Sequence, residues 1–179
     1  MSVNFERKDK LNQFHVAIAA EAYTAGILAR LGYDVSVQYG ANQPQYDLTV
    51  SKDKEDHLVR ISVKGSQDGG WVLFAGYKEK GVDNHQAVER WAEKQMKGLI
   101  YCFVQFKAVD LDSSPRFYFA NVPEIVEHMK TTRGGEGNTV LEENATYKKG
   151  VAKGISDKIP DVWAFSEKRI KELFDLERK

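Results

Sequence analysis

The stretch Val59–Ser66, VRISVKGS, decides how the rest of the chain is interpreted. Its apolar residues alternate with polar ones, which is typical of a β-strand with one buried face. Because residues two apart in a strand point the same way, Ile61 and Val63 share the buried face, while Ser62 and Lys64 share the other. A lysine at the end of a strand is commonly a solvated charge, so its meaning depends on which other side chains point toward it.

A second strand precedes this one and carries a carboxylate on its polar face. In Tyr46–Val50, YDLTV, the apolar side chains face one way and Asp47 faces the other. The connection 52–56 is short and charged, which predicts a hairpin between the two strands. Pairing would bring Asp47 to the same surface as Ser62 and Lys64. Two interpretations stay open: a functional cluster, or a structural cross-strand ion pair between Asp47 and Lys64.

The helix predicted over residues 10–31 adds a third charged group. Its apolar residues recur at helical spacing before Gly32, and they are Leu11, Phe14, Ile18, Ala22, Ala25, Leu28 and Leu31. Glu21 falls on this stripe, which predicts a buried carboxylate. Because an unpaired buried carboxylate is costly, Glu21 would need Lys64, or a metal ion shared with Asp47, as its partner. The alternative is that Glu21 is an ordinary surface residue.

The remaining pattern predicts an α/β fold. Strands are expected at 33–39, 46–51, 57–65, 71–75, 99–108 and 115–120, and helices at 83–98, 123–129 and 166–177. The run 99–108 is continuously apolar, as in a central strand covered on both faces. Hairpins combined with a helical crossover imply a mixed sheet flanked by helices, in a single domain spanning 1–179. Residues 131–158 show little periodicity and are predicted to form a mobile loop near the cleft.

Composition excludes several classes of function. The 26 basic and 26 acidic side chains balance, so nucleic acid or membranes would be bound only through a local patch. No apolar stretch approaches membrane-spanning length and residues 1–11 are charged, so we expect a cytoplasmic protein with no membrane partner. The single Cys102 excludes an internal disulfide and lies in an apolar run typical of a buried thiol. The four dispersed histidines form no zinc-ligand pair.

This combination of residues resembles the PD-(D/E)XK nuclease superfamily. The shared features are the inward Glu21 on a helix, Tyr46-Asp47-Leu48 in one strand, and Ile61-Ser62-Val63-Lys64 at the end of the next. The predicted αβββαβ order is the common core of that superfamily, a restriction-endonuclease-like fold. The chain is most similar to small prokaryotic endonucleases of the kind associated with group I introns, over roughly residues 10 to 130.

The resemblance implies metal-dependent hydrolysis of DNA, as by a Mg²⁺-dependent endodeoxyribonuclease. Glu21 and Asp47 would hold Mg²⁺ or Mn²⁺, and Lys64 would orient the attacking water or neutralise charge in the transition state. Ser62 stands where the family has Asp, Glu or Gln, so it would at most hold a metal-bound water. Its expected place on the open, polar face predicts that Ser62→Glu would tighten metal binding. The alternative is a nuclease-fold module that has lost catalysis and acts in DNA binding or protein interaction.

Lysines outside this cluster are candidates for nucleic-acid binding. They are Lys78 and Lys80 after the motif strand, and Lys148, Lys149 and Lys153 in the loop-like region. A solvated flank is the alternative for these lysines. Trp71 could stack on a base, although core packing is expected. DNA is the expected partner, with RNA as substrate and a homodimer both left open.

Overall fold

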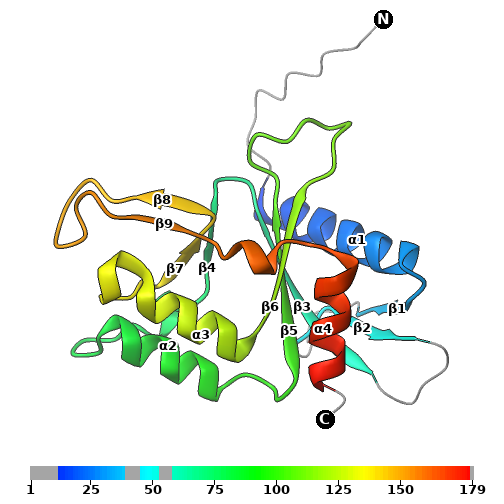
Figure 1. Cartoon of the computed structure of the whole chain (residues 1–179), viewed down its shortest axis with the longest axis horizontal. Coiled ribbons are helices and arrows are strands. Elements are labelled where there is room, and N and C mark those ends of the chain that lie inside the picture. Colours follow the sequence, from blue (N-terminus) through cyan, green and yellow to red (C-terminus); the bar gives the residue numbers. More distant parts are fainter. Residues whose placement is uncertain (1–11, 39–44, 53–57, 178–179) are drawn as a thin grey trace, which may run out of the picture.

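The computed structural model describes residues 12–38, 45–52 and 58–177. Its main elements, in chain order, are α1 (Gln13–Arg30), β1 (Asp34–Val37), β2 (Leu48–Ser51), β3 (Val59–Ser66), α2 (Asn84–Glu93), β5 (Leu99–Gln105), β6 (Arg116–Asn121), α3 (Val122–Thr131) and α4 (Glu167–Glu177), as Figure 1 shows. Shorter elements are β4 (Gly70–Val72), β7 (Val140–Glu142), β8 (Asn144–Thr146), β9 (Ser156–Lys158) and the 3-10 turns η1 (Ala75–Tyr77), η2 (Thr132–Gly135) and η3 (Asp161–Trp163).

Five strands form the central sheet, in the order β1-β2-β3-β5-β6. β2 and β3 pair antiparallel, as predicted, with Leu48 opposite Ile61 and Thr49 opposite Arg60. β3 and β5 are parallel because α2 carries the chain back between them. β6 then pairs antiparallel with β5. The predicted α/β fold, with a mixed sheet flanked by helices, is therefore confirmed.

Different helices cover the two faces of this sheet. Every residue of β5 is buried, and its side chains alternate between two cores. Ile100 and Val104 join a largely aliphatic core with α1 and α4, whereas Tyr101 and Phe103 join an aromatic-rich core with α2 and α3. Burying one such large side chain contributes about 1.5–3 kcal/mol. The predicted central strand with two covered faces is confirmed.

Two predictions about single buried residues are also confirmed. Cys102 is fully buried, and burial raises the pKa of its thiol to about 12, against a smaller lowering by a hydrogen bond with Thr24. Trp71 is buried in the aromatic-rich core beside Phe103, where it packs instead of presenting a face to solvent. Neither residue is therefore offered to a substrate.

Helix α1 buries a different face from the one predicted. Its buried residues are Val16, Ala20, Thr24 and Leu28. Phe14 and Ile18, which begin the predicted stripe, are 69% and 49% exposed. The reason is close approach: a Cβ on Gly65 of β3 would lie only 2.8 Å from the carbonyl oxygen of Val16. At this distance the helix must present small side chains to the sheet. Leu11, the first residue of the predicted stripe, lies outside the described residues.

Residues 131–158 are not the loop that the sequence predicts. They contain η2 and three short strands, and β7 pairs with β4 in a small ladder outside the central sheet. β8 and β9 form a hairpin, here called the arm (144–158), which extends to the left in Figure 1. Strands of three residues are too short to display a period of two, so periodicity in the sequence could not predict β7, β8 and β9. The partner of β4 lies far along the chain, which local patterns do not reveal either.

Among the described residues, no helix combines the length and the apolar character needed to cross a bilayer. The charged stretch 1–11 and most of the connection 52–56 lie outside the residues that the structure describes.

Candidate functional site

Asp47 sits just before β2, at the point where the hairpin ends. Its backbone N–H donates to the carbonyl of Ile61 at 2.9 Å, which continues the ladder by one residue. Its carboxylate Oδ2 accepts the N–H of Val63 at 2.6 Å and the hydroxyl of Ser62 at 3.3 Å. Asp47 is buried, and these hydrogen bonds offset the free-energy cost of burying its carboxylate. They also hold the carboxylate in one orientation. The predicted approach of Asp47 to Ser62 is observed.

Ser62 does not lie on an open face. It is only 1% exposed, and its register partner in β5 is the large Tyr101. The expectation of an open, polar position is wrong, because aromatic side chains from the α2 side cover this part of the sheet. A glutamate at position 62 would place a second buried carboxylate beside that of Asp47 and remove the hydrogen bond that Ser62 donates, which makes the substitution costly. Ser62 instead supports Asp47 as a hydrogen-bond donor.

Lys64 follows two residues after Ser62 and is half-buried. β2 pairs with β3 only as far as Ile61. Among the residues that the structure describes, no strand lies beside residues 62–66 on that edge of β3. No hydrogen bond or ion pair formed by the Lys64 ammonium group is found among the described residues. The structural ion pair between Asp47 and Lys64, which the sequence left open, is thus not formed in the structure.

The third predicted residue, Glu21, lies on α1. This helix packs on the face of β3 that bears Ile61 and Val63, which is the face opposite to Lys64. Burial raises the pKa of Glu21, the negative charge of Asp47 raises it further, and the positive charge of Lys64 lowers it. Asp47 and Lys64 therefore both act electrostatically on Glu21, although no hydrogen bond or ion pair joins Glu21 to either of them among the described residues. Glu21 is half-buried, which lies between the buried carboxylate and the ordinary surface residue that the sequence left as alternatives.

A small pocket of about 280 Å³ opens beside these residues. Ser62 and Lys64 line it, together with Leu73, Tyr77 and Tyr101 among other residues. Burial raises the pKa of the Tyr101 hydroxyl, and the neighbouring Tyr77 and Asp47 raise it further. The hydroxyl donates to Gln95 at 2.6 Å. The pocket therefore combines two lysines, Lys64 and Lys94, with the hydroxyls of Tyr77 and Tyr101 and with one buried carboxylate nearby.

Gln45, which fixes the segment before Asp47, is a residue that sequence patterns did not indicate. The Nε2 atom of Gln45 donates to the carbonyl of Lys94 at 2.7 Å, and its Oε1 atom accepts the N–H of Met96 at 2.7 Å. This pair of bonds ties the start of β2 to the end of α2, and Gln45 also lines the pocket. An amide pairing with a distant backbone leaves no local pattern, so no sequence signal could have identified it.

The two carboxylates fit a hard divalent cation. Mg²⁺ and Mn²⁺ prefer anionic oxygen ligands and retain waters at the remaining positions. Burial raises the pKa of Glu21 and the negative charge of Asp47 raises it further, and a shared cation would remove that repulsion between the two carboxylates. Among the described residues, no cluster of three or more His, Cys, Asp or Glu side chains is arranged to hold a metal. A metal here would thus rest on two protein carboxylates and on water.

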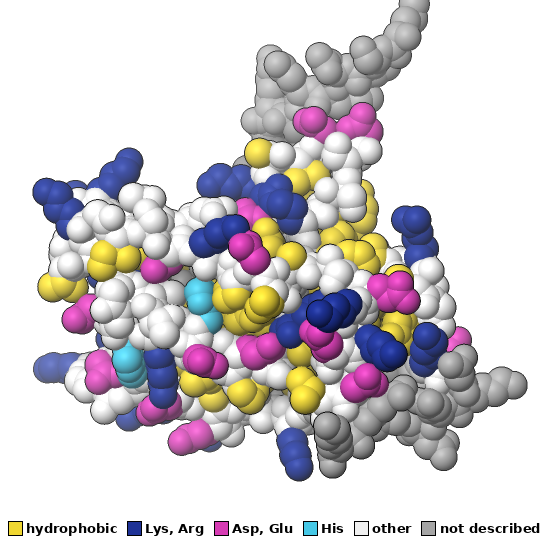
Figure 2. Space-filling model, viewed as in Figure 1, with side chains coloured by type: hydrophobic (Ala, Val, Ile, Leu, Met, Phe, Trp, Pro, Cys, Tyr) yellow, Lys and Arg dark blue, Asp and Glu magenta, His cyan; other side chains and the backbone are white. Residues whose placement is uncertain are grey.

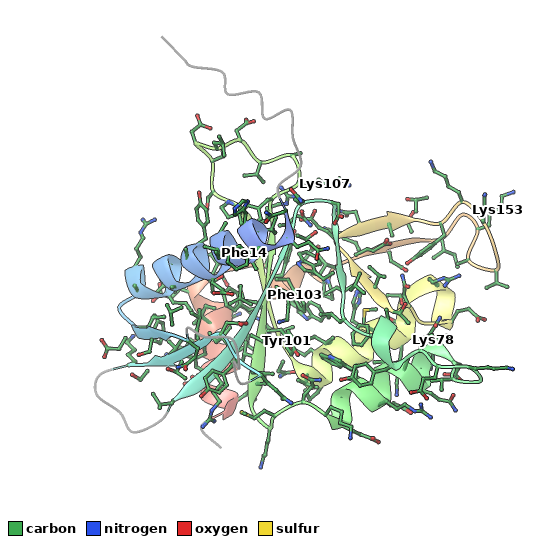
Figure 3. The ribbon with its side chains drawn as sticks, turned by 180° about the vertical axis from the view of Figure 1, so that it is seen from behind. Phe14, Lys78, Tyr101, Phe103, Lys107 and Lys153 are labelled. Carbon is green, nitrogen blue, oxygen red and sulfur yellow. The ribbon has the colours of Figure 1, made fainter. Side chains whose placement is uncertain are left out.

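The lysines predicted to bind nucleic acid fall into two groups, all of them exposed. Lys78 and Lys80 directly follow η1, near the start of α2, whereas Lys148, Lys149 and Lys153 lie between the strands of the arm. Figure 2 shows Lys and Arg side chains projecting from the arm at the upper left, and Figure 3 shows Lys153 and Lys78 on the same side of the molecule. The two groups therefore flank the side that carries α2 and the arm.

Comparisons with protein-family models, with curated proteins and with solved structures find no match to this chain. The fold is an α/β fold with a five-stranded mixed sheet, and its chemistry has to be inferred from the residues around Lys64.

Proposed function

We propose that this protein hydrolyses DNA phosphodiester bonds with the help of a divalent cation, as an endonuclease related to the PD-(D/E)XK superfamily. The observation that carries the proposal is the buried carboxylate of Asp47, which Val63 and Ser62 hold beside the pocket that Lys64 lines, with the charges of Asp47 and Lys64 both acting on Glu21. Two carboxylates that repel each other favour a cation. A lysine whose ammonium group forms no hydrogen bond or ion pair within the described part of the chain favours an anionic substrate such as phosphate.

Each of these residues would have a distinct role. Asp47 would hold Mg²⁺ or Mn²⁺ in a fixed orientation, because Val63 and Ser62 already restrain its Oδ2 atom. Glu21 would be the second carboxylate ligand. When bound, the ion would supply charge stabilisation at the phosphate and lower the pKa of a coordinated water. Lys64 would orient the attacking water or balance the charge that develops on the non-bridging phosphate oxygens.

The exposed lysines of the arm, together with Lys78 and Lys80, would bind the phosphate backbone. Phosphate contacts position a nucleic acid without reading its sequence, which suits flexible, solvent-exposed ammonium groups. The balanced charge of the whole chain fits this arrangement, because binding then depends on local groups of lysines.

A second function is favoured by one specific feature. β3 carries the buried Ser62 where a further carboxylate would strengthen the metal site. A site with only two carboxylates would bind a divalent cation weakly, and in that case the protein would act as a non-catalytic module that binds DNA or another protein.

A metal titration combined with a cleavage assay separates the two functions. Mg²⁺ and Mn²⁺ binding would be measured by calorimetry, and cleavage of supercoiled plasmid would be followed in parallel. We expect Lys64→Met to reduce cleavage by about 100-fold or more, since it removes a charge that acts in the transition state. Asp47→Asn should abolish the calorimetric signal of metal binding.

Lys171→Met is the matched control, because Lys171 is an exposed lysine on α4, which covers the opposite face of the sheet. This control should cleave like the unmodified protein. Plasmid that stays intact with either metal, although the protein binds it, would reject the nuclease and favour the non-catalytic module.

A further inference from the structure

A groove of about 800 Å³ lies outside the central sheet. Its walls come from the two small ladders: β4 and β7 contribute Gly70, Val72, Val140 and Glu142, and residues 144–149 of the arm form the other side. Lys107, from the connection after β5, completes the lining. None of the residues around the Lys64 pocket takes part in it.

The groove carries an excess of positive charge. Lys107, Lys148 and Lys149 line it, against the carboxylates of Asp68 and Glu142. Asp68 already accepts the hydroxyl of Ser66 at 3.1 Å. Figure 3 shows Lys107 above the centre of the molecule and Lys153 at the far end of the arm, so ammonium groups stand at both ends of this region.

Gly69 brings the ammonium group of Lys107 close to the groove. The Nζ atom of Lys107 lies 3.1 Å from the point that a Cβ on Gly69 would occupy, and Gly69 has a φ of +102°. A side chain here would be strained and would press on Lys107. The glycine therefore allows a cation to lie against the backbone that leads into β4.

An aromatic ring lies among these cations. Tyr147 lines the groove, and the guanidinium carbon of Arg133 lies 5.5 Å from its ring centroid. The Tyr147 hydroxyl accepts a hydrogen bond from Asn138 at 3.2 Å. Arg133 has a φ of +55°, and its buried Nε atom finds no hydrogen-bond partner among the residues that the structure describes. A strained arginine with an unmet donor, held over a tyrosine ring, is an arrangement that functional sites often retain.

The groove and the pocket beside Lys64 are lined by neighbouring residues. Val72 lines the groove, and the next residue, Leu73, lines the pocket. Trp71 fixes this segment, because its indole N–H donates to the backbone carbonyl of Lys64 at 2.8 Å.

Size limits the kind of nucleic acid that fits. A volume of about 800 Å³ lies within the range of about 300–1,000 Å³ typical of pockets for small ligands. A duplex, whose major groove alone is about 12 Å wide, cannot enter it. A single strand can, since its phosphates can follow the lysines while a base stacks on an aromatic ring.

We propose that this groove binds a single-stranded segment of nucleic acid, with phosphates on Lys107, Lys148 and Lys149 and one base stacked on Tyr147. The inference rests on the proposed action on DNA and specifies its substrate as DNA with an unpaired strand beside the cleavage point.

The test is fluorescence anisotropy with a labelled single-stranded oligonucleotide and its duplex, in EDTA so that no metal-dependent cleavage occurs. Replacing Lys107, Lys148 and Lys149 together by Met should weaken single-strand binding by about tenfold or more. It should also lower the salt slope by about 2, at about 0.7 for each lysine. Replacing Lys97, Lys168 and Lys171 by Met is the control, because these exposed lysines lie outside the groove, and it should change single-strand binding little.

Stacking is tested by a matched pair of variants. Tyr147→Leu should lose about fivefold or more in single-strand affinity, whereas Tyr147→Phe keeps the ring and should retain it. The proposal would be rejected if the affinity losses were equal for single strand and duplex, or if neither Tyr147 variant lost affinity. It would also be rejected if a polyglutamate peptide displaced the labelled strand at the concentration at which unlabelled oligonucleotide competes. The groove would then be a site for acidic protein segments.

The outcome also separates this inference from the proposed function. If groove variants bind single strands normally while Lys64→Met still abolishes plasmid cleavage, only the proposal of single-strand binding in the groove is rejected. If the unmodified protein binds neither oligonucleotide, that proposal and the proposal of DNA as the partner are both rejected.

Discussion

The central sheet and the segment 132–158 are stabilised in different ways. The sheet is held by apolar burial on two faces, with β5 buried at every position. The segment has few buried apolar side chains and is fastened by polar contacts. Glu143 accepts two bonds from Arg116, at 2.6 and 2.9 Å, and one from the Tyr118 hydroxyl at 2.6 Å. Apolar burial is non-directional and tolerates variation, whereas these contacts depend on individual atoms.

The largest effect should come from the centre of the sheet. Phe103 is fully buried in β5 and packs against Trp71, Tyr101 and Trp163. Phe103→Ala should lower the free energy of unfolding by about 3–5 kcal/mol, because it removes apolar contacts and leaves a cavity. Urea denaturation followed by fluorescence measures this change. Leu111→Ala, at a position 64% exposed, should stay within about 0.5 kcal/mol of the parent. Equal effects of the two changes would refute the proposed role of the two-faced core.

A smaller loss is expected where the segment is fastened to the sheet. Arg116→Met leaves the buried carboxylate of Glu143 with one hydrogen-bond donor, and should cost about 1–3 kcal/mol. Limited proteolysis should then cut between residues 140 and 158 sooner than in the parent. The comparison variant is Arg90→Met, which removes an exposed ion pair to Glu79 and should cost at most about 1 kcal/mol. Unchanged proteolysis in Arg116→Met would mean that other contacts fasten this segment.

The same contact makes stability depend on pH. Burial acts to raise the pKa of Glu143, but hydrogen bonds from Arg116 and Tyr118 outweigh it, so the pKa lies below its ordinary value. A lowered pKa in the folded state stabilises the protein at pH values above the ordinary carboxyl pKa of about 4.3. This stabilisation is lost as the pH falls through the lower, folded value. The gap in unfolding free energy between the parent and Glu143→Gln should therefore narrow in acid, as urea midpoints at several pH values would reveal. A gap that widens in acid would contradict the sign of this pKa shift.

The smallest effect should appear at a polar bond inside the sheet. Ser62→Ala removes the 3.3 Å bond to Asp47 but leaves the 2.6 Å bond from Val63. The expected cost is about 0.5–1 kcal/mol, at the lower end for a hydrogen bond, because the lost bond is long. Thermal unfolding can measure it against Ser113→Ala, an exposed serine that should be neutral. A loss of several kcal/mol would show that the Ser62 hydroxyl, and not the N–H of Val63, is the main support of Asp47.

Local sequence patterns predicted the elements whose burial has a regular period. The hairpin of β2 and β3, the doubly covered β5 and the burial of Cys102 all followed from alternation or from an unbroken apolar run. The helix predicted over 83–98 is observed as α2 (Asn84–Glu93), where Asp83 caps the start by accepting the N–H of Gln86. The approach of Asp47 to Ser62 followed from the hairpin alone, because strand alternation and register fix which residues share a surface.

Only the tertiary structure decided the features that depend on contacts between distant parts of the chain. The close approach at Gly65 selected the small-residue face of α1 over the face that bears Phe14 and Ile18. Packing from the α2 side buried Ser62, although alternation alone would leave it open. β4 left the central sheet because its partner β7 lies far along the chain, and that pairing also formed the groove. Alternation and spacing report on neighbours in sequence, whereas close approach, burial and non-local pairing are set by which elements meet in space.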